Sequence, residues 1–415
     1  MVIIIFIVLG ILLLIDVYAF KGIRMLTNDI SSSNVRYSIH LFYWFITIFA
    51  FSGIIYASGN ASIIRSPKYM PYFFNFIGIL TLFMVPKLVF VVFHLMEDII
   101  HLVKIIVNYA YTGSDYSGEK ISRHNFLTKM GIIIAAIPFI SIAYGILRGR
   151  YNFRVLRETL SFPNLPTAFD GLRIAVISDI HIGSFGKNRA PVEKGIEMVN
   201  ALEPDVIFFT GDLVNNMTDE THGWLDTLKN LKAKKGKYSV LGNHDYGDYI
   251  PWKSPQAKEE NLNQLKAFHR EIDFHLLLND SVELEQEGEK IALIGVENWG
   301  AGRFSKYGDL QKAMRGAGGK PFKILLSHDP SHWDAQVLEK TDIDLTFSGH
   351  THGFQFGIEI PWLKWSPAQI KYPRWAGLYQ EGKQKLYVNR GFGFIGFPGR
   401  VGIPPEITLV ELKAA

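Results

Sequence analysis

The 415-residue chain contains no cysteine, which excludes disulfide bonds and thiolate metal sites. Any metal ion in this protein must therefore be held by His, Asp, Glu or Asn side chains or by backbone oxygens. The formal net charge of +4 is small, and no stripe of basic residues interleaved with aromatic residues is present. We therefore expect no nucleic-acid partner. Internal repeats and low-complexity segments are absent as well.

Charged residues are scarce in the first third of the chain, where four long apolar runs occur. They cover residues 2–20, 38–58, 71–95 and 131–147. Because a bilayer core requires roughly 17–25 apolar residues per helix, the runs predict four transmembrane helices and a multi-pass integral membrane protein. Asp16 and Lys87 are the only charged residues within the runs. A lysine in mid-span is costly in lipid, so Lys87 must reach the membrane surface or face protein.

The orientation of these spans is nearly balanced by charge counting. If the C-terminal domain lies outside, the inner loops carry seven Lys and Arg residues and the outer loops carry six. Residues 122–129, just before the fourth run, resemble a twin-arginine export signal in which His124 replaces the second arginine. An ordinary basic juxtamembrane loop is an equal alternative. The export signal favours an extracytoplasmic domain, and a polar loop is expected around residues 113–118.

Residues 148–166 differ in character from the apolar runs. They combine four arginines with a Pro-Asn-Leu-Pro sequence at residues 163–166. We interpret this stretch as a linker that leaves the membrane surface, and its arginines can equally pair with anionic lipid head groups. Residues 167–415 then form a separate domain.

Five short apolar runs in this domain end in polar residues. The runs at 172–178, 206–210, 238–241, 322–327 and 344–347 predict buried strands, and further strands are expected at 274–278, 291–295, 385–389 and 406–412. The polar residues that follow the five runs are Asp179, His181, Asp212, Asn243, His244, Asp245, His328, His350 and His352. Because α/β sheets bind ligands at the carboxyl ends of their strands, we expect these side chains to converge.

Each of these motifs also has an ordinary structural explanation. Asp179-x-His181 alone is more often a capped turn than a ligand pair. The Asn243-His244-Asp245 sequence has the composition of a turn, since Asn and Asp tolerate left-handed backbone. His328 before Asp329-Pro330 is compatible with the start of a helix. A functional site is favoured because all the motifs occur together, each at the end of a strand.

The order and spacing of the motifs resemble those of the calcineurin-like metallophosphoesterase superfamily over residues 172–353. The four apolar runs, together with residues 388–391 and 402–407, are similar to the membrane-associated YkuE/YaeI-like phosphoesterases. The resemblance implies an α/β fold, namely a calcineurin-like four-layer sandwich in which two mixed β-sheets are flanked by helices. Here this sandwich would be preceded by an α-helical transmembrane region.

The resemblance also assigns roles to the strand-end residues by their positions in the motifs. The first of two metal ions would be held by Asp179, His181 and His352. The second would be held by Asn243, His328 and His350, and Asp212 would bridge the two. His244 would be a catalytic contact to the phosphate or the leaving oxygen, and Asp245 would orient it.

The residue types suit this chemistry. Two divalent cations would bring four positive charges, whereas Asp179 and Asp212 return two negative ones, so the site suits a phosphate anion. Two metals can clamp the attacking and leaving oxygens of an in-line displacement and can supply hydroxide near neutral pH. Oxygen and imidazole ligands suit Mn, Fe, Zn or Co.

We therefore predict a membrane-anchored, dinuclear-metal-dependent phosphoric ester hydrolase that cleaves a phosphate mono- or diester with a metal-bridging hydroxide. Membrane tethering suggests a lipid-linked phosphodiester or pyrophosphate as the substrate. One alternative is a non-catalytic membrane sensor or scaffold that binds a phosphorylated ligand, which loss of His244 or of a bridging ligand would indicate. Neither is lost. A transporter subunit is a further alternative, for which only Asp16 and Lys87 could line a path.

Three features near the motifs remain open. Residues 297–299 either line the substrate pocket or form an ordinary loop. Arg390 and Arg400 either reach the phosphate or a lipid head group or are solvated. The apolar segment 392–398 would enter lipid or bind an acyl chain if exposed, and would belong to the core if buried.

Overall fold

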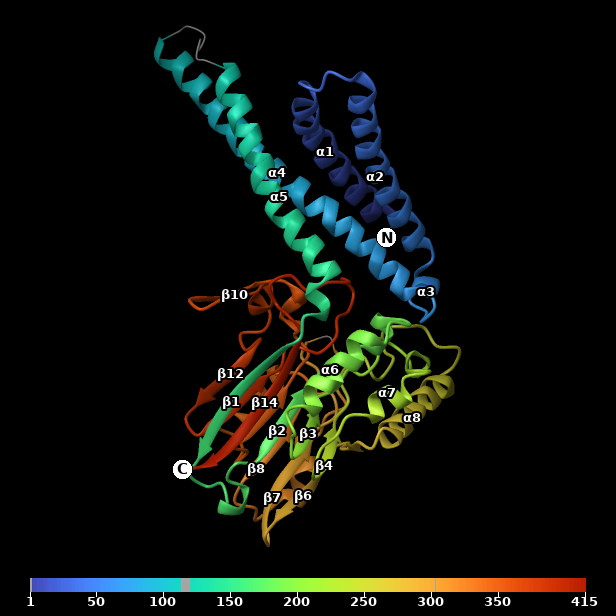
Figure 1. Ribbon diagram of the computed structural model, residues 1–415, viewed down its shortest axis with the longest axis vertical. Helices are drawn as coiled ribbons and strands as arrows, with labels where there is room; N and C mark the ends of the chain where they lie inside the picture. Colours follow the sequence, from blue (N-terminus) through green and yellow to red (C-terminus); the bar gives the residue numbers. More distant parts are fainter. Residues whose placement is uncertain (1, 113–119, 303) are drawn as a thin grey trace. The chain divides into compact units, whose positions relative to one another are not determined.

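The computed structural model describes residues 2–112, 120–302 and 304–415 (Figure 1). The polar loop predicted around residues 113–118 lies outside the described residues. The chain forms two compact units. The first contains residues 1–64 and 75–144, and the second contains residues 65–74 and 145–415.

The first unit is helical. Its helices are α1 (Val2–Thr27), α2 (Ser33–Gly59), the short α3 (Ala61–Ile64), α4 (Met70–Thr112) and α5 (Lys120–Leu147). In the described residues, four stretches are long and apolar enough to cross a membrane, namely Ile3–Thr27, Ser33–Gly59, Met70–Tyr111 and Lys129–Tyr151. Each predicted run falls within one of the four long helices. Helix α4, which contains the third apolar run, extends to Thr112, well beyond the predicted end of that run at residue 95.

The lysine in the third apolar run faces protein. Lys87 Nζ lies 2.5 Å from Asp16 Oδ1, and Asp16 is completely buried. Tyr43 on α2 donates a hydrogen bond from its hydroxyl to the Asp16 backbone carbonyl (2.7 Å). The two charged residues of the apolar runs therefore compensate each other, which meets the condition that the sequence sets for this helix.

The second unit contains two six-stranded sheets. The first has the order β1 (Arg154–Phe162), β14 (Glu406–Ala414), β2 (Arg173–Ile177), β3 (Val206–Phe209), β4 (Gly236–Ser239) and β5 (His275–Leu276). The second has the order β12 (Gly377–Glu381), β13 (Gln384–Val388), β9 (Leu345–Ser348), β8 (Lys323–Leu326), β7 (Glu289–Gly295) and β6 (Asp280–Gln286). Both sheets mix parallel and antiparallel pairs, and a separate hairpin joins β10 (Ile358–Ile360) to β11 (Leu363–Trp365).

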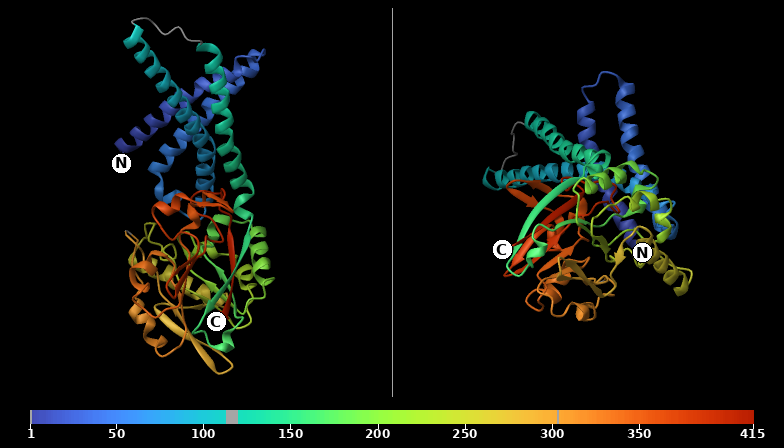
Figure 2. Two further views of the ribbon diagram at one scale, coloured as in Figure 1. Left: turned by 90° about the vertical axis from the view of Figure 1, so that its left-hand side faces the viewer. Right: turned by 60° about the horizontal axis from the view of Figure 1, so that its bottom comes forward.

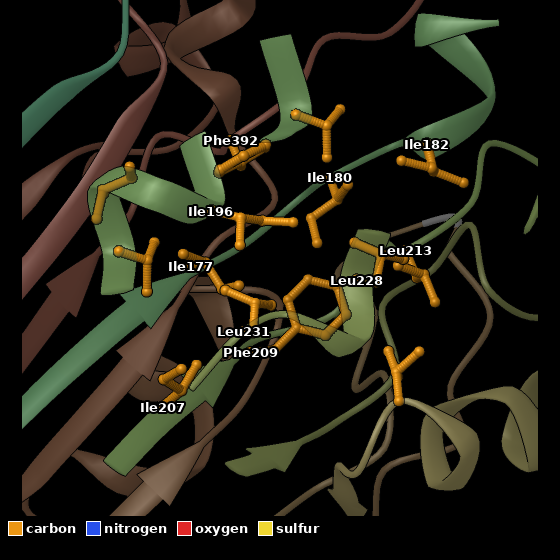
Figure 3. Close-up of a cluster of buried hydrophobic side chains, with 14 of the residues drawn as sticks. Ile177, Ile180, Ile182, Ile196, Ile207, Phe209, Leu213, Leu228, Leu231 and Phe392 are labelled. Atoms are coloured by element: carbon orange, nitrogen blue, oxygen red, sulfur yellow. The ribbon is translucent and has the colours of Figure 1, made fainter. Parts of the chain in front are cut away.

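Alternating side chains along the strands bind four layers together. On β2, Ile174 and Val176 pack between the sheets with Phe347 of β9, whereas Ile177 points to the opposite face. On that face lie α6 (Ala190–Asn200), α7 (Leu225–Lys229) and α8 (Pro255–Glu271), and Figure 3 shows Ile196 of α6 and Leu228 of α7 around Ile177. The outer face of the second sheet is covered by α9 (Leu310–Ala313) and the turn around Trp333. The predicted four-layer sandwich is confirmed, and Figure 2 shows it from two further directions.

The linker predicted for residues 148–166 is largely wrong. Residues Arg154–Phe162 form β1, which pairs in parallel with β14 from Arg154 opposite Glu406 to Phe162 opposite Ala414. This edge strand mixes charged, polar and apolar residues without alternation, so its composition resembles that of a polar linker. Its partner lies at the other end of the chain, and local sequence therefore gives no sign of the pairing. Strands β6, β10, β11 and β12 were not predicted either.

Candidate metal centre

The predicted site residues follow the carboxyl ends of neighbouring strands. β2, β3 and β4 are adjacent in the first sheet, and β8 and β9 are adjacent in the second. Backbone hydrogen bonds join the turns after these strands, from Asp179 N to Gly211 O (2.9 Å) and from Gly349 N to His328 O (2.9 Å). Both sheets therefore contribute to one site.

Five of the seven predicted metal ligands have left-handed backbone. They are Asp179 (φ 52°), His181 (47°), Asp212 (61°), His350 (73°) and His352 (49°). Such conformations cost about 1–3 kcal/mol each in non-glycine residues and persist only where the surroundings impose them. Gly349 permits one tight approach, because a Cβ there would collide with Ser178 Oγ and Asp179 Oδ2. This concentration of strain at the strand ends is typical of functional sites.

Asp179, His181 and His352 form a buried cluster, which we call the first group. His352 Nε2 lies 3.1 Å from His181 Nε2 and 3.2 Å from Asp179 Oδ1. The His181 ring is held at Nδ1, 3.1 Å from the Val214 carbonyl oxygen, and Asp179 Oδ2 accepts the His350 backbone amide (3.0 Å). One ligand atom from each member lies within 4.8 Å of the others, so a single ion can contact all three.

His328, His350 and Asn243 form a second group beside the first. His350 Nδ1 lies 2.8 Å from Asn243 Oδ1, and the His328 ring is held at Nδ1 by the Thr210 carbonyl (2.7 Å). Together with Asp212, the two histidines form another set whose ligand atoms lie within 4.8 Å of one another. The structure thus brings together all seven residues in the two sets that the motifs suggested.

The Asp212 carboxylate lies between the two groups. Its Oδ2 is 3.1 Å from His328 Nε2 in the second group and 3.6 Å from His181 Nε2 in the first. Its Oδ1 accepts the His244 backbone amide (2.8 Å). Asp212 can therefore contact ions in both groups.

The donor atoms of this centre fit metal ions. Two imidazole nitrogens of the first group face each other at 3.1 Å, although the His181 ring already uses its other nitrogen on a carbonyl. Among the described residues, the buried His328 Nε2 lacks a hydrogen-bond partner of good geometry, although Asp212 Oδ2 is near. A cation between these groups would satisfy buried nitrogens that are directed at carboxylates and at each other.

The charge states of the side chains agree with this fit. Burial opposes ionisation of Asp179 and Asp212, but the neighbouring histidines outweigh it and hold the pKa of both carboxyl groups below the usual range. Burial likewise opposes charge on His328, yet the two carboxylates raise its pKa to about 10. Burial lowers the pKa of His350 to about 4. A divalent ion would replace the His328 proton, because imidazole binds metals in its neutral form.

His244 and Asp245 have different partners. His244 Nδ1 lies 2.6 Å from the Asn215 carbonyl oxygen. The Asp245 carboxylate instead accepts backbone amides from Asp212 (2.8 Å) and Gly242 (2.8 Å). The prediction that Asp245 orients His244 is therefore wrong: the Asn215 carbonyl orients the ring, and the Asp245 carboxylate is occupied by backbone amides and fixes two site loops.

Two tyrosines outside the motifs hold members of the second group. Asn243 Nδ2 donates to Tyr249 Oη (2.8 Å), which directs the amide oxygen at His350. His350 Nε2 lies 2.8 Å from Tyr372 Oη. Only the nearness of Tyr249 to the Asn243 turn could have suggested its role from sequence, and nothing in the sequence marks Tyr372.

An open cavity of about 330 Å³ adjoins both groups. His181, Asp212, Asn243, His244, His350 and His352 form its polar lining. Other parts of the lining are Phe304, Phe354, Lys371, Tyr372, Ile395 and Phe397. The cavity therefore combines a polar metal centre with an aromatic and aliphatic wall.

Comparisons with known proteins agree with this geometry. Residues 172–354 match the family model of the calcineurin-like phosphoesterases, a range that includes every predicted ligand. Residues 1–150 match the model described as a probable calcineurin-like phosphoesterase transmembrane domain. The uncharacterized metallophosphoesterase YkuE of Bacillus subtilis is 30% identical over 307 residues, which cover 71% of this chain and 99% of that protein. The chain belongs to the calcineurin-like phosphoesterase family. The transmembrane-domain match and the four apolar helices together support membrane association.

Three further proteins are similar to this chain. A transmembrane protein with metallophosphoesterase domain from Danio rerio is 29% identical over 295 residues, which cover 69% of this chain and 63% of that protein. This chain thus spans less than two thirds of that vertebrate relative. The uncharacterized metallophosphoesterase Cj0846 of Campylobacter jejuni is 26% identical, with 90% and 92% coverage. Among solved structures, the phosphopantetheinyl hydrolase PptH of Mycobacterium tuberculosis has a TM-score of 0.30 and 13% identity, and the match covers 53% of this chain and 89% of that one.

In this family member, the two tail arginines are buried, so the expectation that they are solvated is wrong. Arg390 pairs with Glu406 (Nε to Oε2, 2.5 Å) and with Glu359 (Nη1 to Oε1, 2.5 Å). Arg400 Nη2 lies 3.1 Å from His352 Nδ1, and Arg400 Nε donates to the Gly393 carbonyl (2.8 Å). Arg400 therefore holds the His352 ring at Nδ1, while Nε2 of that ring faces the other members of the first group.

The apolar segment 392–398 is divided between core and cavity. Phe392 and Phe394 are buried in the core, whereas Ile395 and Phe397 line the cavity. Glu297 accepts a hydrogen bond from Tyr246 Oη (3.0 Å), so its carboxylate serves the fold. The core interpretation therefore holds for Phe392 and Phe394, and contact of Ile395 and Phe397 with an acyl chain stays a prediction.

Proposed function

We propose that this chain is a membrane-anchored phosphoesterase that hydrolyses a phosphate mono- or diester with two divalent metal ions, of which Mn, Fe and Zn suit the ligands best. The main support is the arrangement of two ligand groups around the shared carboxylate of Asp212. The first ion would be held by Asp179, His181 and His352. The second would be held by Asn243, His328 and His350.

The residues around the two groups suit hydrolysis of a phosphate ester. When bound, the two ions would polarise the phosphate and make water a nucleophile near neutral pH. Asp179 and Asp212 supply only two negative charges, so the loaded centre would remain cationic and attract a phosphate anion. His244 donates from Nδ1 to the Asn215 carbonyl, which leaves Nε2 to contact the phosphate or the leaving oxygen.

The cavity lining favours a substrate with an apolar portion. Phe354, Ile395 and Phe397 line the same cavity as the ligand groups, and Phe354 is 44% exposed. An apolar wall of this kind binds acyl or isoprenoid chains. Lys371 in the same lining would attract a second anionic group of a diester or pyrophosphate. We therefore favour a lipid-linked phosphodiester or pyrophosphate.

The membrane topology can be argued from which residues belong to the second unit. Residues 65–74 connect the second and third apolar helices and belong to the same unit as residues 145–415. If all four helices cross the membrane, this connection and the phosphoesterase domain lie on one side. We propose that this side is extracytoplasmic. Because the chain lacks cysteine, Lys68→Cys should react with an impermeant thiol reagent in intact cells and Ser31→Cys should not, and the reverse result would place the domain in the cytoplasm.

Hydrolysis assays on the full-length protein in lipid nanodiscs test the activity. Mn, Zn and Mg would be supplied in turn with 4-nitrophenyl phosphate, bis(4-nitrophenyl) phosphate and an isoprenoid pyrophosphate. We expect metal-dependent hydrolysis that Asp212→Asn abolishes and that Asp219→Asn, at an exposed position nearby, retains. Binding of these compounds without turnover under every metal would contradict the proposal and favour the sensor.

A further inference from the structure

The β10–β11 hairpin exposes an apolar face. Its register places Ile358 opposite Trp365 and Ile360 opposite Leu363, so these four side chains share one face. All four are exposed, and Trp362 at the turn is 83% exposed. Single exposed apolar residues are ordinary, but a contiguous face with two tryptophans indicates an interaction surface.

The opposite face of the hairpin is polar and is attached to the phosphoesterase domain. Glu359 and Lys364 face each other across the two strands. Glu359 accepts hydrogen bonds from the buried Arg390 (2.5 and 2.6 Å), and Lys364 Nζ donates to the Ala376 carbonyl (2.7 Å). This arrangement reverses the usual one, in which a hairpin buries its apolar face. Since the polar contacts hold the hairpin in place, its apolar face stays turned outward.

The hairpin lies close to the point where the chain leaves its last apolar helix. Gly145, near the end of α5, accepts a hydrogen bond from Arg400 N at its carbonyl (3.1 Å). The next residue, Val401, accepts the amide of Gly357 (2.9 Å), and Gly357 directly precedes β10. Figure 1 shows the hairpin and the start of β1 at the same end of this unit. The hairpin is therefore tied by short contacts to the segment that joins domain and membrane.

We propose that the β10–β11 hairpin docks on the bilayer in which the chain is anchored, with its apolar face and Trp362 at the boundary between head groups and acyl chains. Tryptophan prefers this boundary, where an apolar ring and a polar N–H are both satisfied. Ile370 and Lys371 follow the hairpin and are also exposed, which adds an apolar anchor and a charge for anionic head groups.

Docking would also bring the cavity to the lipid surface. The turn His352–Gln355 runs from a predicted metal ligand to within three residues of β10, and its Phe354 lines the cavity. Lys371 lines the same cavity. A lipid-linked phosphate could then enter without leaving the membrane surface. This consequence rests on the proposed function, whereas the docking itself does not.

Spin labelling of the full-length protein tests the docking directly. The absence of native cysteine allows a single nitroxide at Trp362→Cys, in nanodiscs of phosphatidylcholine and phosphatidylglycerol that hold one copy. The matched control is Glu285→Cys on β6, an exposed site on the edge strand of the second sheet. We expect the label at 362 to be relaxed more by oxygen than by a water-soluble nickel chelate, and the label at 285 to show the opposite. Equal accessibility of the two labels to the chelate would overturn the proposal, as would protection at 362 that occurs only in discs with two copies.

Hydrolysis measurements separate docking from catalysis. We expect Trp362→Ser with Trp365→Ser to lower the rate at least tenfold on an isoprenoid pyrophosphate in vesicles and to leave the rate on soluble 4-nitrophenyl esters unchanged. Trp362→Phe with Trp365→Phe should restore the vesicle rate. An equal loss on both substrates would overturn the role in lipid presentation. A wild-type protein that hydrolyses nothing would refute the proposed function and leave the labelling result intact.

Discussion

The two ligand groups differ in charge and in what supports them. The first group contributes a carboxylate of its own, Asp179, whereas Asn243, His328 and His350 of the second group are neutral ligands. The two share Asp212. Metal affinity rises with the number of charged ligands and with the rigidity of the site. The first group should therefore bind its ion more tightly.

The supports of the two groups differ in a related way. In the first group, the ring of His181 is held by a backbone carbonyl, and the carboxylate of Asp179 accepts a backbone amide. In the second group, a backbone carbonyl also holds the ring of His328, but Tyr249 and Tyr372 hold the amide of Asn243 and the imidazole of His350 through their hydroxyls. A side-chain hydroxyl on a loop is easier to displace than a strand-end backbone. The comparison suggests one permanent ion and one that exchanges more readily.

Replacing the shared carboxylate should have the largest effect. Asp212→Ala removes a ligand from both groups and leaves buried imidazoles facing one another, so we expect both ions and all hydrolysis to be lost. Metal analysis after dialysis and the hydrolysis assay measure this loss. Asp219→Ala serves as the control. Retention of one tight ion in Asp212→Ala would show that the carboxylate is not shared.

Single-group variants should distinguish the two ions. Asp179→Ala removes the charge that is specific to the first group, so we expect a chain that keeps no ion through dialysis. His350→Ala removes a neutral ligand, so one tightly held ion should remain, with little hydrolysis. Equal metal retention in the two variants would contradict the asymmetry.

The tyrosine hydroxyls should affect only the second ion. Loss of an outer-shell hydrogen bond to a ligand costs about 10–100-fold in metal affinity, so we expect a weakening of this size in Tyr249→Phe and Tyr372→Phe. Calorimetric titration with Mn should show an unchanged tight step and a weaker second step. A change in the tight step would indicate a general loss of structure.

Arg65 lies in the segment that connects the second and third apolar helices. Its contact with Tyr249 should have a smaller effect on the affinity for the second ion. Arg65 Nη1 donates to the Tyr249 carbonyl (2.7 Å), and Tyr249 in turn holds Asn243. A single hydrogen bond contributes about 1 kcal/mol, so Arg65→Ala should weaken the second ion by about fivefold at most. Lys68→Ala, in the same segment, is the control. We expect Arg65→Lys to recover part of the affinity. An unchanged second binding step in Arg65→Ala would show that this contact does not support the second ion.

In the loop that orients His244, we expect an effect on stability and none on metal binding. Glu220 is buried and accepts backbone amides from Asn215 (2.7 Å) and Asn216 (2.8 Å). Burial raises its pKa from 4.5 to about 7, although the amides oppose the change. The folded chain therefore holds this proton more tightly than the unfolded chain. Stability should fall as pH rises from about 4.5 to 7, by on the order of 3 kcal/mol, and then level off.

Thermal unfolding in detergent between pH 5 and 8 measures this dependence. Glu220→Gln should make the profile less steep, whereas Glu271→Gln, at an exposed helix end, should leave it unchanged. A profile that keeps its slope in Glu220→Gln would assign the dependence to another group.

Much of the fold was accessible from sequence because local signals and motif order agree. Strands β2, β3 and β9 are short apolar runs followed at once by ligand residues, so pattern and chemistry mark the same positions. The four apolar helices need only length and composition. By contrast, β1 is an edge strand of mixed charged, polar and apolar residues, and its partner β14 lies at the far end of the chain. Pairing over such a distance leaves no local trace.

The site residues also divide into those that the sequence marked and those that it did not. The seven strand-end residues lie together in the expected groups, because strand ends of adjacent sheets meet at one edge. Tyr372, Lys371 and Phe354 come from loops whose path depends on tertiary packing, so nothing in their local sequence marked them. Arg390 and Arg400 were expected to be solvated, because the carboxylate and carbonyl oxygens that hold them lie on other segments.

Titration of the metal-free, full-length protein with Mn, followed by electron paramagnetic resonance, tests the two-group centre most directly. We expect two ions per chain, the first bound tightly and the second more weakly, and a spectrum that becomes exchange-coupled only when the second ion enters. A single uncoupled ion, or none, at saturating Mn would contradict a centre built on Asp212.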